Sequence, residues 1–205
     1  MAQRTIQFAY RMTHIDNIED ILRVGIVKAS SPNANPNYVP IGDKTAIDTR
    51  HNKRLQDGSL IGDYIPFYFG PRTPMLYVIQ HGYNNVKKQD AADIVYCVIA
   101  LEDVINNALD CVFTDGHALN KITRLFSGKL LHEVDKYISY DIVYAQSWNE
   151  EPDKKRKKEA ELLLKNDLPQ QYIRYFLVYN NAAKEKLLNL GVAPNMVRTV
   201  PHFYF

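Results

Sequence analysis

The chain has 205 residues, of which 46% are hydrophobic and 23% are charged, and its formal net charge is +2. This composition is typical of a soluble globular protein with a core, and so small a net charge does not by itself indicate a nucleic-acid partner. No run approaches the ~20 apolar residues of a membrane span, and the first ten residues lack the apolar core of a secretory signal. We therefore expect a cytoplasmic protein with no membrane partner.

The first part of the chain combines short regular elements with a long polar stretch. Residues 5–12 alternate as a strand does, and 13–25 carry the apolar stripe of a short helix, capped by Thr13 or Asp16 and ended by Gly25. Residues 29–60 are polar and contain several Pro and Asn residues. A loop of this length is usually functional or disordered, and the pattern allows one helix within 45–55.

The rest of the chain predicts strands between short helices. Strands are expected within 63–69, 93–101, 110–115, 160–166, 172–180 and 197–205, and helices within 74–82, 102–109 and 182–191, while 117–128 and 131–147 are helical or mixed. The order lacks a regular βαβ rhythm, so it indicates an α+β fold. No linker divides the chain, and we expect a single domain over residues 1–205.

Few residues have the spacing of a known catalytic or metal motif. Cys97 and Cys111 lie in apolar contexts and are predicted to be small buried side chains. No Cys and His spacing resembles a zinc site, and no glycine-rich phosphate loop is present, so no metal is expected. Basic residues cluster at 50–54 and 154–158, which fits either two solvated loops or one phosphate-binding surface.

Several polar and aromatic residues lie at the predicted strand ends. Arg11 interrupts an apolar strand, where it either pairs with a structural carboxylate or holds a phosphate or ribose. Thr13 and Asn17 lie near a helix start, where backbone N–H groups favour anions. Tyr68 belongs to an aromatic strand suited to core packing or to stacking on a flat ring. His117 falls in a turn and is either merely exposed or functional.

Residues 154–165, KKRKKEAELLLK, raise the question of what their two glutamates do. If this stretch were a strand, Glu159 and Glu161 would share one face, because side chains two apart point the same way. Spacing alone therefore does not separate a surface charge from a carboxylate at the lip of an anion-binding site.

Four blocks together resemble one family. These are THIDNIEDILRVGI, the central DGSLIGDYIPFYFGPRTPMLYVI, CVFTDGHAL, and KKRKKEAELLL, and their order and spacing hold over nearly the whole chain. The sequence resembles the DarT family, the DNA ADP-ribosyltransferase toxins of bacterial toxin–antitoxin pairs.

The resemblance implies an ADP-ribosyltransferase fold, with two small, mainly antiparallel sheets forming an NAD-binding cleft flanked by helices. It also implies NAD⁺ as co-substrate, a base of single-stranded DNA as acceptor, and a macrodomain antitoxin that removes the modification. Glu161 matches the family's catalytic Glu, and the segment before it matches the substrate-recognising loop. We expect cofactor contacts from Arg11, Met12, Thr13, Asn17, Gly25, Arg50 and Tyr68, and DNA contacts from Arg54, Arg72, Met75, His117, Trp148, Lys154, Lys155 and Arg156.

The chain departs from the family pattern at two places. Many members carry His where this sequence has Arg11, although a guanidinium also binds phosphate. Thymine-modifying members carry two adjacent arginines, the second of which is tied to catalysis. An ungapped alignment places these at Arg50 and His51, and a shift by one restores Arg50 to the key role. His51 as the counterpart favours guanine over thymine, because imidazole accepts a proton near neutral pH.

Two other classes of function stay open. An ADP-ribosyltransferase could use RNA or protein as acceptor, and Glu159 has the position of the second acidic residue that protein-arginine enzymes tend to carry. A non-catalytic nucleic-acid-binding module on the same fold is the other alternative, against which Glu161, Arg11 and Tyr68 argue.

Overall fold

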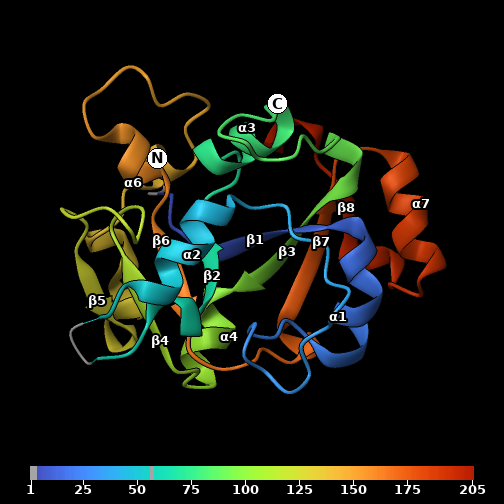
Figure 1. The fold of residues 1–205 in the computed structure, drawn as a ribbon, viewed down its shortest axis with the longest axis horizontal. Coiled ribbons are helices and arrows are strands. Elements are labelled where there is room, and N and C mark those ends of the chain that lie inside the picture. The colour runs from blue at the N-terminus through green and yellow to red at the C-terminus, as the bar shows by residue number, and fades with distance from the viewer. Residues whose placement is uncertain (1–3, 56–57) are drawn as a thin grey trace.

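A computed structural model describes residues 4–55 and 58–205. Figure 1 shows a twisted sheet crossing the molecule, with helices around it. The described strands are β1 (Phe8–His14), β2 (Ile65–Tyr68), β3 (Ile94–Ala100), β4 (Cys111–Thr114), β5 (Leu125–Ser127), β6 (Glu161–Leu164), β7 (Ile173–Val178) and β8 (Val197–Thr199). They form an eight-stranded sheet in the order β5-β4-β6-β2-β1-β3-β7-β8. The α+β class is confirmed.

The expectation of two separate small sheets is wrong, because the strands form one sheet. A seam between β1 and β2 separates two groups of four strands, but Tyr10 pairs with Tyr68 across it and makes the sheet continuous. Beyond this pair, Pro66 has no N–H to donate to β1, and its carbonyl accepts from Nη1 of Arg11 at 3.1 Å. The sheet is also mixed, since β7 and β8 run parallel.

Seven α-helices surround the sheet in the described part of the chain: α1 (Ile18–Val24), α2 (Lys44–Asn52), α3 (Pro74–His81), α4 (Leu101–Asn106), α5 (Tyr140–Val143), α6 (Lys154–Lys158) and α7 (Asn181–Asn189). The helix predicted within the polar stretch is confirmed as α2, where the Asp43 side chain accepts from the N–H groups of Thr45 and Ala46. None of the described helices has the length and hydropathy to cross a membrane.

The start of α1 differs from the prediction. Its N-cap is Asn17, which makes no capping hydrogen bond with its side chain. The Asn17 side chain instead exchanges hydrogen bonds with the N–H and carbonyl of Val39, at 2.8 and 2.9 Å. Gly25 ends the helix as expected, with φ of 84°, and a Cβ here would lie 2.2 Å from the Leu168 carbonyl oxygen. At the start of the helix, therefore, the Asn17 side chain bonds to the Val39 backbone in place of a local capping hydrogen bond.

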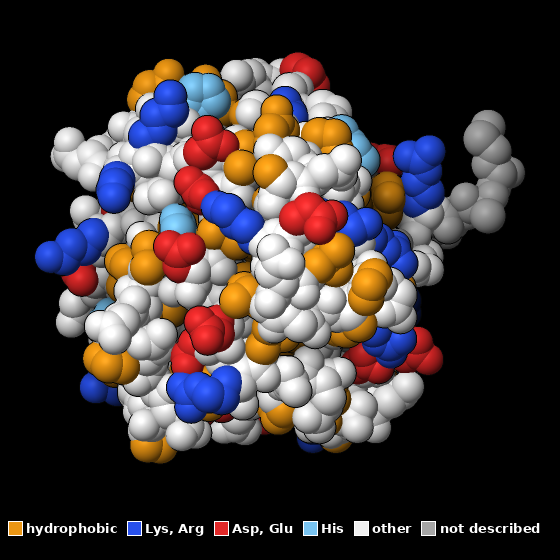
Figure 2. All heavy atoms as spheres, turned by 90° about the vertical axis from the view of Figure 1, so that its right-hand side faces the viewer, with side chains coloured by type: hydrophobic (Ala, Val, Ile, Leu, Met, Phe, Trp, Pro, Cys, Tyr) orange, Lys and Arg blue, Asp and Glu red, His pale blue; other side chains and the backbone are white. Residues whose placement is uncertain are grey.

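The core lies on both faces of the sheet. Every residue of β3 is buried, as its continuous apolar pattern predicted, and Cys97 and Cys111 are buried free thiols. Burial raises the pKa of Cys97 to about 12 and that of Cys111 to about 11, so both thiols are neutral and unreactive at neutral pH. On the molecular face that Figure 2 shows, acidic, basic and apolar side chains are interspersed.

The last third of the chain contains further departures from prediction. Residues 117–128 include the strand β5, and the C-terminal strand is limited to β8, followed by a 3-10 turn at Pro201–Phe203. The basic run forms α6 rather than a loop, and Glu159 caps its C-terminus, so Glu159 and Glu161 do not share a strand. The Lys158 side chain is fully buried and donates to the Val143 carbonyl at 3.0 Å.

Candidate active site

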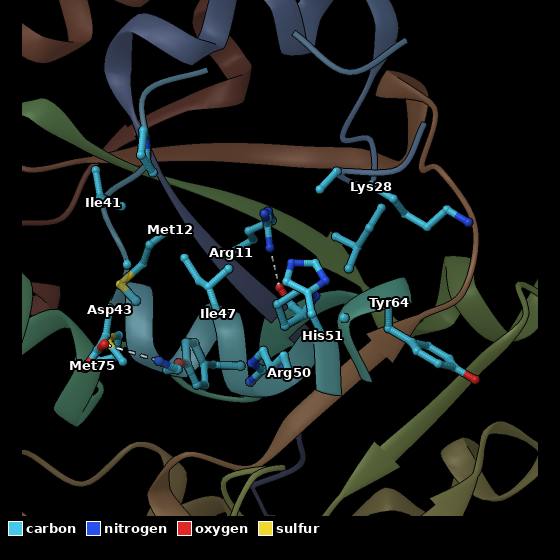
Figure 3. Close-up of a pocket in the computed structure, with 18 of the residues that line it drawn as sticks. Arg11, Met12, Lys28, Ile41, Asp43, Ile47, Arg50, His51, Tyr64 and Met75 are labelled. Atoms are coloured by element: carbon cyan, nitrogen blue, oxygen red, sulfur yellow. Dashed lines mark hydrogen bonds between the residues drawn. The ribbon is translucent and has the colours of Figure 1, made fainter. Parts of the chain in front are cut away.

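A cavity of about 370 Å³ opens at the seam of the sheet. Figure 3 shows side chains from β1, α2 and the loop that precedes α2 around it, together with Tyr64, which immediately precedes β2. Arg11 and Lys28 supply positive charge to its lining, and Tyr38 and Ile47 supply exposed apolar surface, being 41% and 39% accessible. A cavity of this volume with cations and uncovered apolar walls suits an anionic ligand with flat rings.

Glu161 lies beside this cavity as the first residue of β6. It pairs across the strands with Tyr68, which lines the cavity, and it is fully buried. The Ala118 N–H donates to its Oε1 at 2.9 Å, and Nη2 of Arg50 lies 2.5 Å from its Oε2. Both carboxylate oxygens are thus fixed, and a buried carboxylate needs such partners.

The neighbours of Glu161 set the charges at this end of the cavity. Burial lowers the pKa of Arg50, but the Glu161 carboxylate outweighs this and raises it above the ordinary value, so Arg50 is a cation. Burial, followed by the charge of Glu161, raises the pKa of Tyr68 well above its usual value. Its hydroxyl is therefore neutral and able to donate a hydrogen bond.

Two further groups near the carboxylate have perturbed protonation. Burial and the neighbouring Glu161 raise the pKa of Glu159 to about 8, so Glu159 is largely protonated at neutral pH. Burial lowers the pKa of His117 despite the opposing effect of Glu161, which favours neutral imidazole. Among the titratable groups that contact Glu161, the ion pair with Arg50 is therefore the dominant charge interaction.

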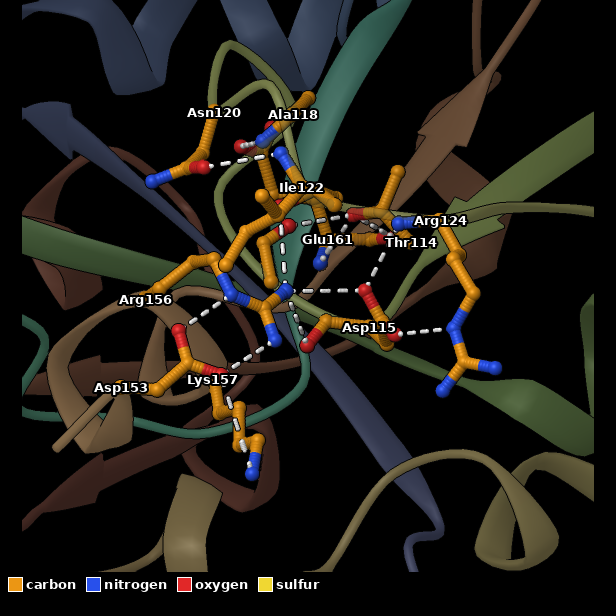
Figure 4. A network of polar contacts seen from close by, with 12 residues as sticks. Thr114, Asp115, Ala118, Asn120, Ile122, Arg124, Asp153, Arg156, Lys157 and Glu161 are labelled. Carbon is orange, nitrogen blue, oxygen red and sulfur yellow. Dashed lines mark hydrogen bonds and ion pairs between the residues drawn. The ribbon is translucent and has the colours of Figure 1, made fainter. Parts of the chain in front are cut away.

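An ion-pair network holds the turn that contacts Glu161 (Figure 4). Nη1 of Arg156 lies 2.9 Å from Oδ1 of Asp115, and its Nε lies 2.6 Å from Oδ1 of Asp153. The Arg156 carbonyl accepts from the His117 N–H at 3.0 Å. Arg156 thereby connects α6 to residues 115–118, which carry the Ala118 N–H to the carboxylate.

The predicted cofactor residues divide into two groups. Four of them line the cavity: Arg11, Met12, Arg50 and Tyr68. The lining does not include Thr13, Asn17 or Gly25. Thr13 and Asn17 are buried and hydrogen-bonded to each other, and Asn17 holds the loop that carries Tyr38. Thr13 and Asn17 thus support the cavity wall, whereas Gly25 lies against the Leu168 backbone, outside the lining. The predicted contacts of all three with cofactor stay a prediction.

The predicted DNA residues are more dispersed. Met75 and His117 line the cavity at the seam, whereas Trp148 and Lys155 line a second cavity. The remaining four make contacts within the protein: Arg54 with the Gly58 carbonyl, Arg72 with the Tyr204 carbonyl, Lys154 with Glu150, and Arg156 with Asp115 and Asp153.

The positions of Arg50 and His51 bear on the two possible alignments. Both lie in the last turn of α2 and line the cavity. Arg50 reaches Glu161, whereas His51 packs against Gly62, where an added Cβ would lie 2.5 Å from its Nδ1. Of the two side chains, Arg50 is thus the one that contacts the Glu161 carboxylate. The alignment of Arg50 or His51 with the family's key arginine stays a prediction.

Several site residues were not predicted from the sequence. Ala118 acts through its backbone, which leaves no side-chain signature. Tyr38 and Asp43 belong to the polar stretch, and Lys28 immediately precedes it, so no local pattern specifies the path of the chain at these residues. The long loop itself was the available signal, because loops of this length often carry function.

A family model covers nearly all of this architecture. Residues 10–205 match the model described as "DarT: ssDNA thymidine ADP-ribosyltransferase, DarT". The chain belongs to the DarT family. This membership confirms the resemblance seen in the sequence and the predicted enzyme class, an ADP-ribosyltransferase that acts on DNA.

Individual DarT relatives agree with the family assignment. The DNA ADP-ribosyl transferase of Thermus sp. (strain 2.9) is 31% identical over 183 residues, which cover 88% of this chain and 85% of that protein. Solved structures of the Thermus DarT, with ADP-ribosylated ssDNA and with NAD⁺, superpose with TM-scores of 0.83 and 0.79 at 27% identity. They cover all of this chain and 99% and 100% of theirs.

A longer relative carries a second activity in its name. The Thermosipho africanus protein, a "DNA ADP-ribosyl transferase-DNA ADP-ribosyl glycohydrolase fusion protein", is 28% identical over 204 residues. Those residues cover 96% of this chain and 49% of the fusion protein. The present chain is thus similar in extent to one half of that relative.

Proposed function

We propose that this protein transfers ADP-ribose from NAD⁺ to a base of single-stranded DNA and releases nicotinamide. The observation that carries the proposal is Glu161, held by Arg50 and Ala118 beside a cavity whose lining carries two further cations, Arg11 and Lys28. NAD⁺ is the co-substrate, as the Thermus relative solved with NAD⁺ supports. Arg11 and Lys28 fit the pyrophosphate, since guanidinium and ammonium groups bind phosphate oxygens.

The chemistry places a positive charge on the ribose in the transition state. The bond from C1′ to the nicotinamide nitrogen breaks, the nicotinamide departs with the electron pair, and the sugar acquires oxocarbenium character. A fixed carboxylate at Glu161 stabilises that charge and orients the ribose hydroxyl. The base nitrogen then forms the new bond to C1′, and its proton passes to the carboxylate or to solvent.

Thymine is the acceptor base that we propose. Arg50 contacts the catalytic carboxylate, so its guanidinium is placed to stabilise negative charge developing on the thymine ring as N3 loses its proton. The description of the family model, which names thymidine, supports the same base. The guanine prediction rested on His51 as the counterpart; His51 also lines the cavity, so guanine is the second candidate.

Two oligonucleotides decide between these bases. The protein is incubated with NAD⁺ and single-stranded DNA that lacks either thymine or guanine, and the product mass is measured. We expect an added ADP-ribose on the strand without guanine and none on the strand without thymine. The opposite pattern would establish guanine, and modification of neither strand, but of RNA or protein, would establish the alternative acceptors.

We also propose that the protein is a toxin opposed by a macrodomain antitoxin that removes the modification. The fused glycohydrolase of the Thermosipho relative supports such a partner. Expression in a bacterial host tests it: the wild-type chain should arrest growth, whereas Glu161→Gln should not. Co-expression of a DNA ADP-ribosyl glycohydrolase should restore growth, and arrest that persists with it would contradict the pairing.

A further inference from the structure

A second cavity, of about 440 Å³, lies outside the site described above. It is bounded by the first turn of α3, the turn that follows α3, residues 146–149 and Phe205, with Lys155 of α6 in its lining. In Figure 1, α3 and the C-terminus lie together at the top of the molecule. No step of the proposed transfer uses this cavity.

Aromatic rings make up most of the apolar wall of this cavity. The Tyr77 ring lies 5.8 Å from that of Trp148 and 5.0 Å from that of Phe205, both edge to face. Tyr83 lies 5.6 Å from Tyr77 and is 50% exposed. Edge-to-face contacts fix the planes of the Trp148 and Phe205 rings against Tyr77, whereas the Tyr83 ring is tilted by 34° to Tyr77 and stacks on His81. Aromatic rings that are held in this way and remain partly exposed suit the stacking of a flat ligand.

Polar groups complete the cavity in a manner suited to a nucleotide. Asn84, Gln146 and Asn149 line it, and side-chain amides both donate to and accept from base edges. Lys155 is exposed, and within the described residues it forms no ion pair, whereas its neighbour Lys154 is paired with Glu150 at 2.8 Å. Lys155 is therefore available to a phosphate.

The second cavity adjoins the first. Pro74 lines the second cavity and Met75 lines the first, so the start of α3 forms a wall of both. The charge of Lys155 also reaches Glu159 and His117, which lie beside the catalytic carboxylate. A single strand with one base at Glu161 therefore needs few further nucleotides to reach Trp148.

We propose that this second cavity binds a base of the same DNA strand that flanks the modified base, stacked on Trp148 and Tyr83, with Lys155 on its phosphate. The inference rests on the proposed function and adds a second point of contact that contributes to the choice of sequence around the target. A purely apolar partner fits less well, because the amides and the free lysine would lose their hydrogen bonds to water.

Single abasic positions in the oligonucleotide locate this contact. Removing the base that occupies the cavity should raise the KM for DNA by roughly tenfold or more, as expected for a lost base–aromatic stack. Trp148→Ala and Tyr83→Ala should raise the KM of the intact strand similarly and be insensitive to that one abasic position. Tyr175→Ala, a half-buried ring outside both cavities, is the matched control and should leave KM unchanged.

Fluorescence separates this inference from the transfer reaction. Trp148 is the only tryptophan of the chain, so oligonucleotide binding to Glu161→Gln can be followed by its emission without turnover. Quenching that is lost at the same abasic position supports the cavity. Equal KM in wild type and Trp148→Ala, or additive effects of Trp148→Ala at every abasic position, would overturn it. Quenching without any transfer by the wild type would refute the proposed function alone.

Discussion

At the scale of single residues, the candidate site depends on a carboxylate, both oxygens of which accept hydrogen bonds from the protein. Glu161 accepts from Ala118 and from Arg50, and Tyr68 is its partner across the strands. The carboxylate is thus oriented before any ligand arrives, which is the condition under which fixed charges stabilise a transition state most effectively.

Replacing Glu161 tests this orientation directly. Glu161→Gln keeps the shape but removes the charge, so kcat for transfer should fall by about 10²–10³-fold or more while DNA binding is retained. Product mass and oligonucleotide affinity are the measurements. Glu133→Gln is the control, because Glu133 forms a surface pair with Lys136 at 2.7 Å, and such pairs contribute little. A Glu161→Gln variant with wild-type kcat would remove Glu161 from the mechanism.

The Arg50–Glu161 pair should also be visible in stability. Arg50→Met leaves a buried carboxylate without its cation, which costs about 3–5 kcal/mol. The double variant Arg50→Met/Glu161→Gln removes both charges, so its loss should be smaller than the sum of the two single losses by at least ~1 kcal/mol. Urea denaturation of all four proteins measures this coupling, and strictly additive losses would contradict a stabilising pair.

At the scale of elements, the turn at 115–118 depends on α6. Arg156 was predicted to contact DNA, yet its guanidinium binds Asp115 and Asp153 and is mostly buried. Its carbonyl also accepts from His117. The short helix α6 is therefore coupled to the turn whose Ala118 N–H holds the Glu161 carboxylate.

Gly116 offers a test of this coupling. A Cβ at this position would lie 2.3 Å from Nη1 and 2.9 Å from the carbonyl oxygen of Arg156. Gly116→Ala should therefore displace the turn, lower the free energy of unfolding by about 1–3 kcal/mol and reduce kcat more than NAD⁺ affinity. Chemical denaturation and steady-state kinetics provide the measurements; an unchanged kcat would show that the turn tolerates the shift.

The helices and strands were easier to predict than the pairing between strands. Continuous apolar runs and alternation identified β1, β3 and β6, and the helix α2 followed from its local pattern. Local pattern does not specify which strands pair. The sequence therefore did not reveal the Tyr10–Tyr68 pairing that makes one sheet from two groups of four strands. The cap at Asn17 was missed for a similar reason, because its side chain bonds to a loop 22 residues away.

For the candidate site, as for the fold, individual residues were easier to predict than the contacts between them. The resemblance pointed to Glu161 and left Arg50 and His51 as alternatives. The structure places Glu161 beside the cavity, and the position of α2 brings Arg50 to its carboxylate. The burial of Arg156 and Lys158 was not predictable, because a run of five basic residues normally indicates a solvated surface. Only their tertiary partners account for it.

At the scale of the whole molecule, two buried groups give stability a characteristic pH dependence. The pKa of Glu159 is about 8 in the folded state against 4.5 ordinarily, so the unfolded state binds fewer protons between these values and stability falls as pH rises. The pKa of Lys158 is about 8 against 10.5, so the unfolded state binds more protons there and stability rises from pH 8 to 10.5.

Single substitutions should remove these two effects separately. Relative to wild type, Glu159→Gln should flatten the fall between about pH 4.5 and 8, and Lys158→Met should flatten the rise above about pH 8. Urea midpoints measured from pH 5 to 10 follow both. If the Glu159→Gln variant kept the wild-type slope below pH 8, the result would mean that the Glu159 carboxyl of the wild type is ionised in the folded protein.

The seam in the sheet has a consequence for how the chain can be divided. The strands β2, β4, β5 and β6 lie on one side and β1, β3, β7 and β8 on the other, so the backbone crosses the seam four times, after β1, β2, β3 and β6. Neither group of strands is a continuous stretch of sequence. A backbone cut between β6 and β7 therefore yields two fragments that each lack part of the same four-stranded group. The first fragment keeps Glu161 and every residue that lines the first cavity, but its β3 loses the partner strand β7. We therefore expect this fragment to form the cavity only when the second fragment is added, although the second fragment supplies no lining residue.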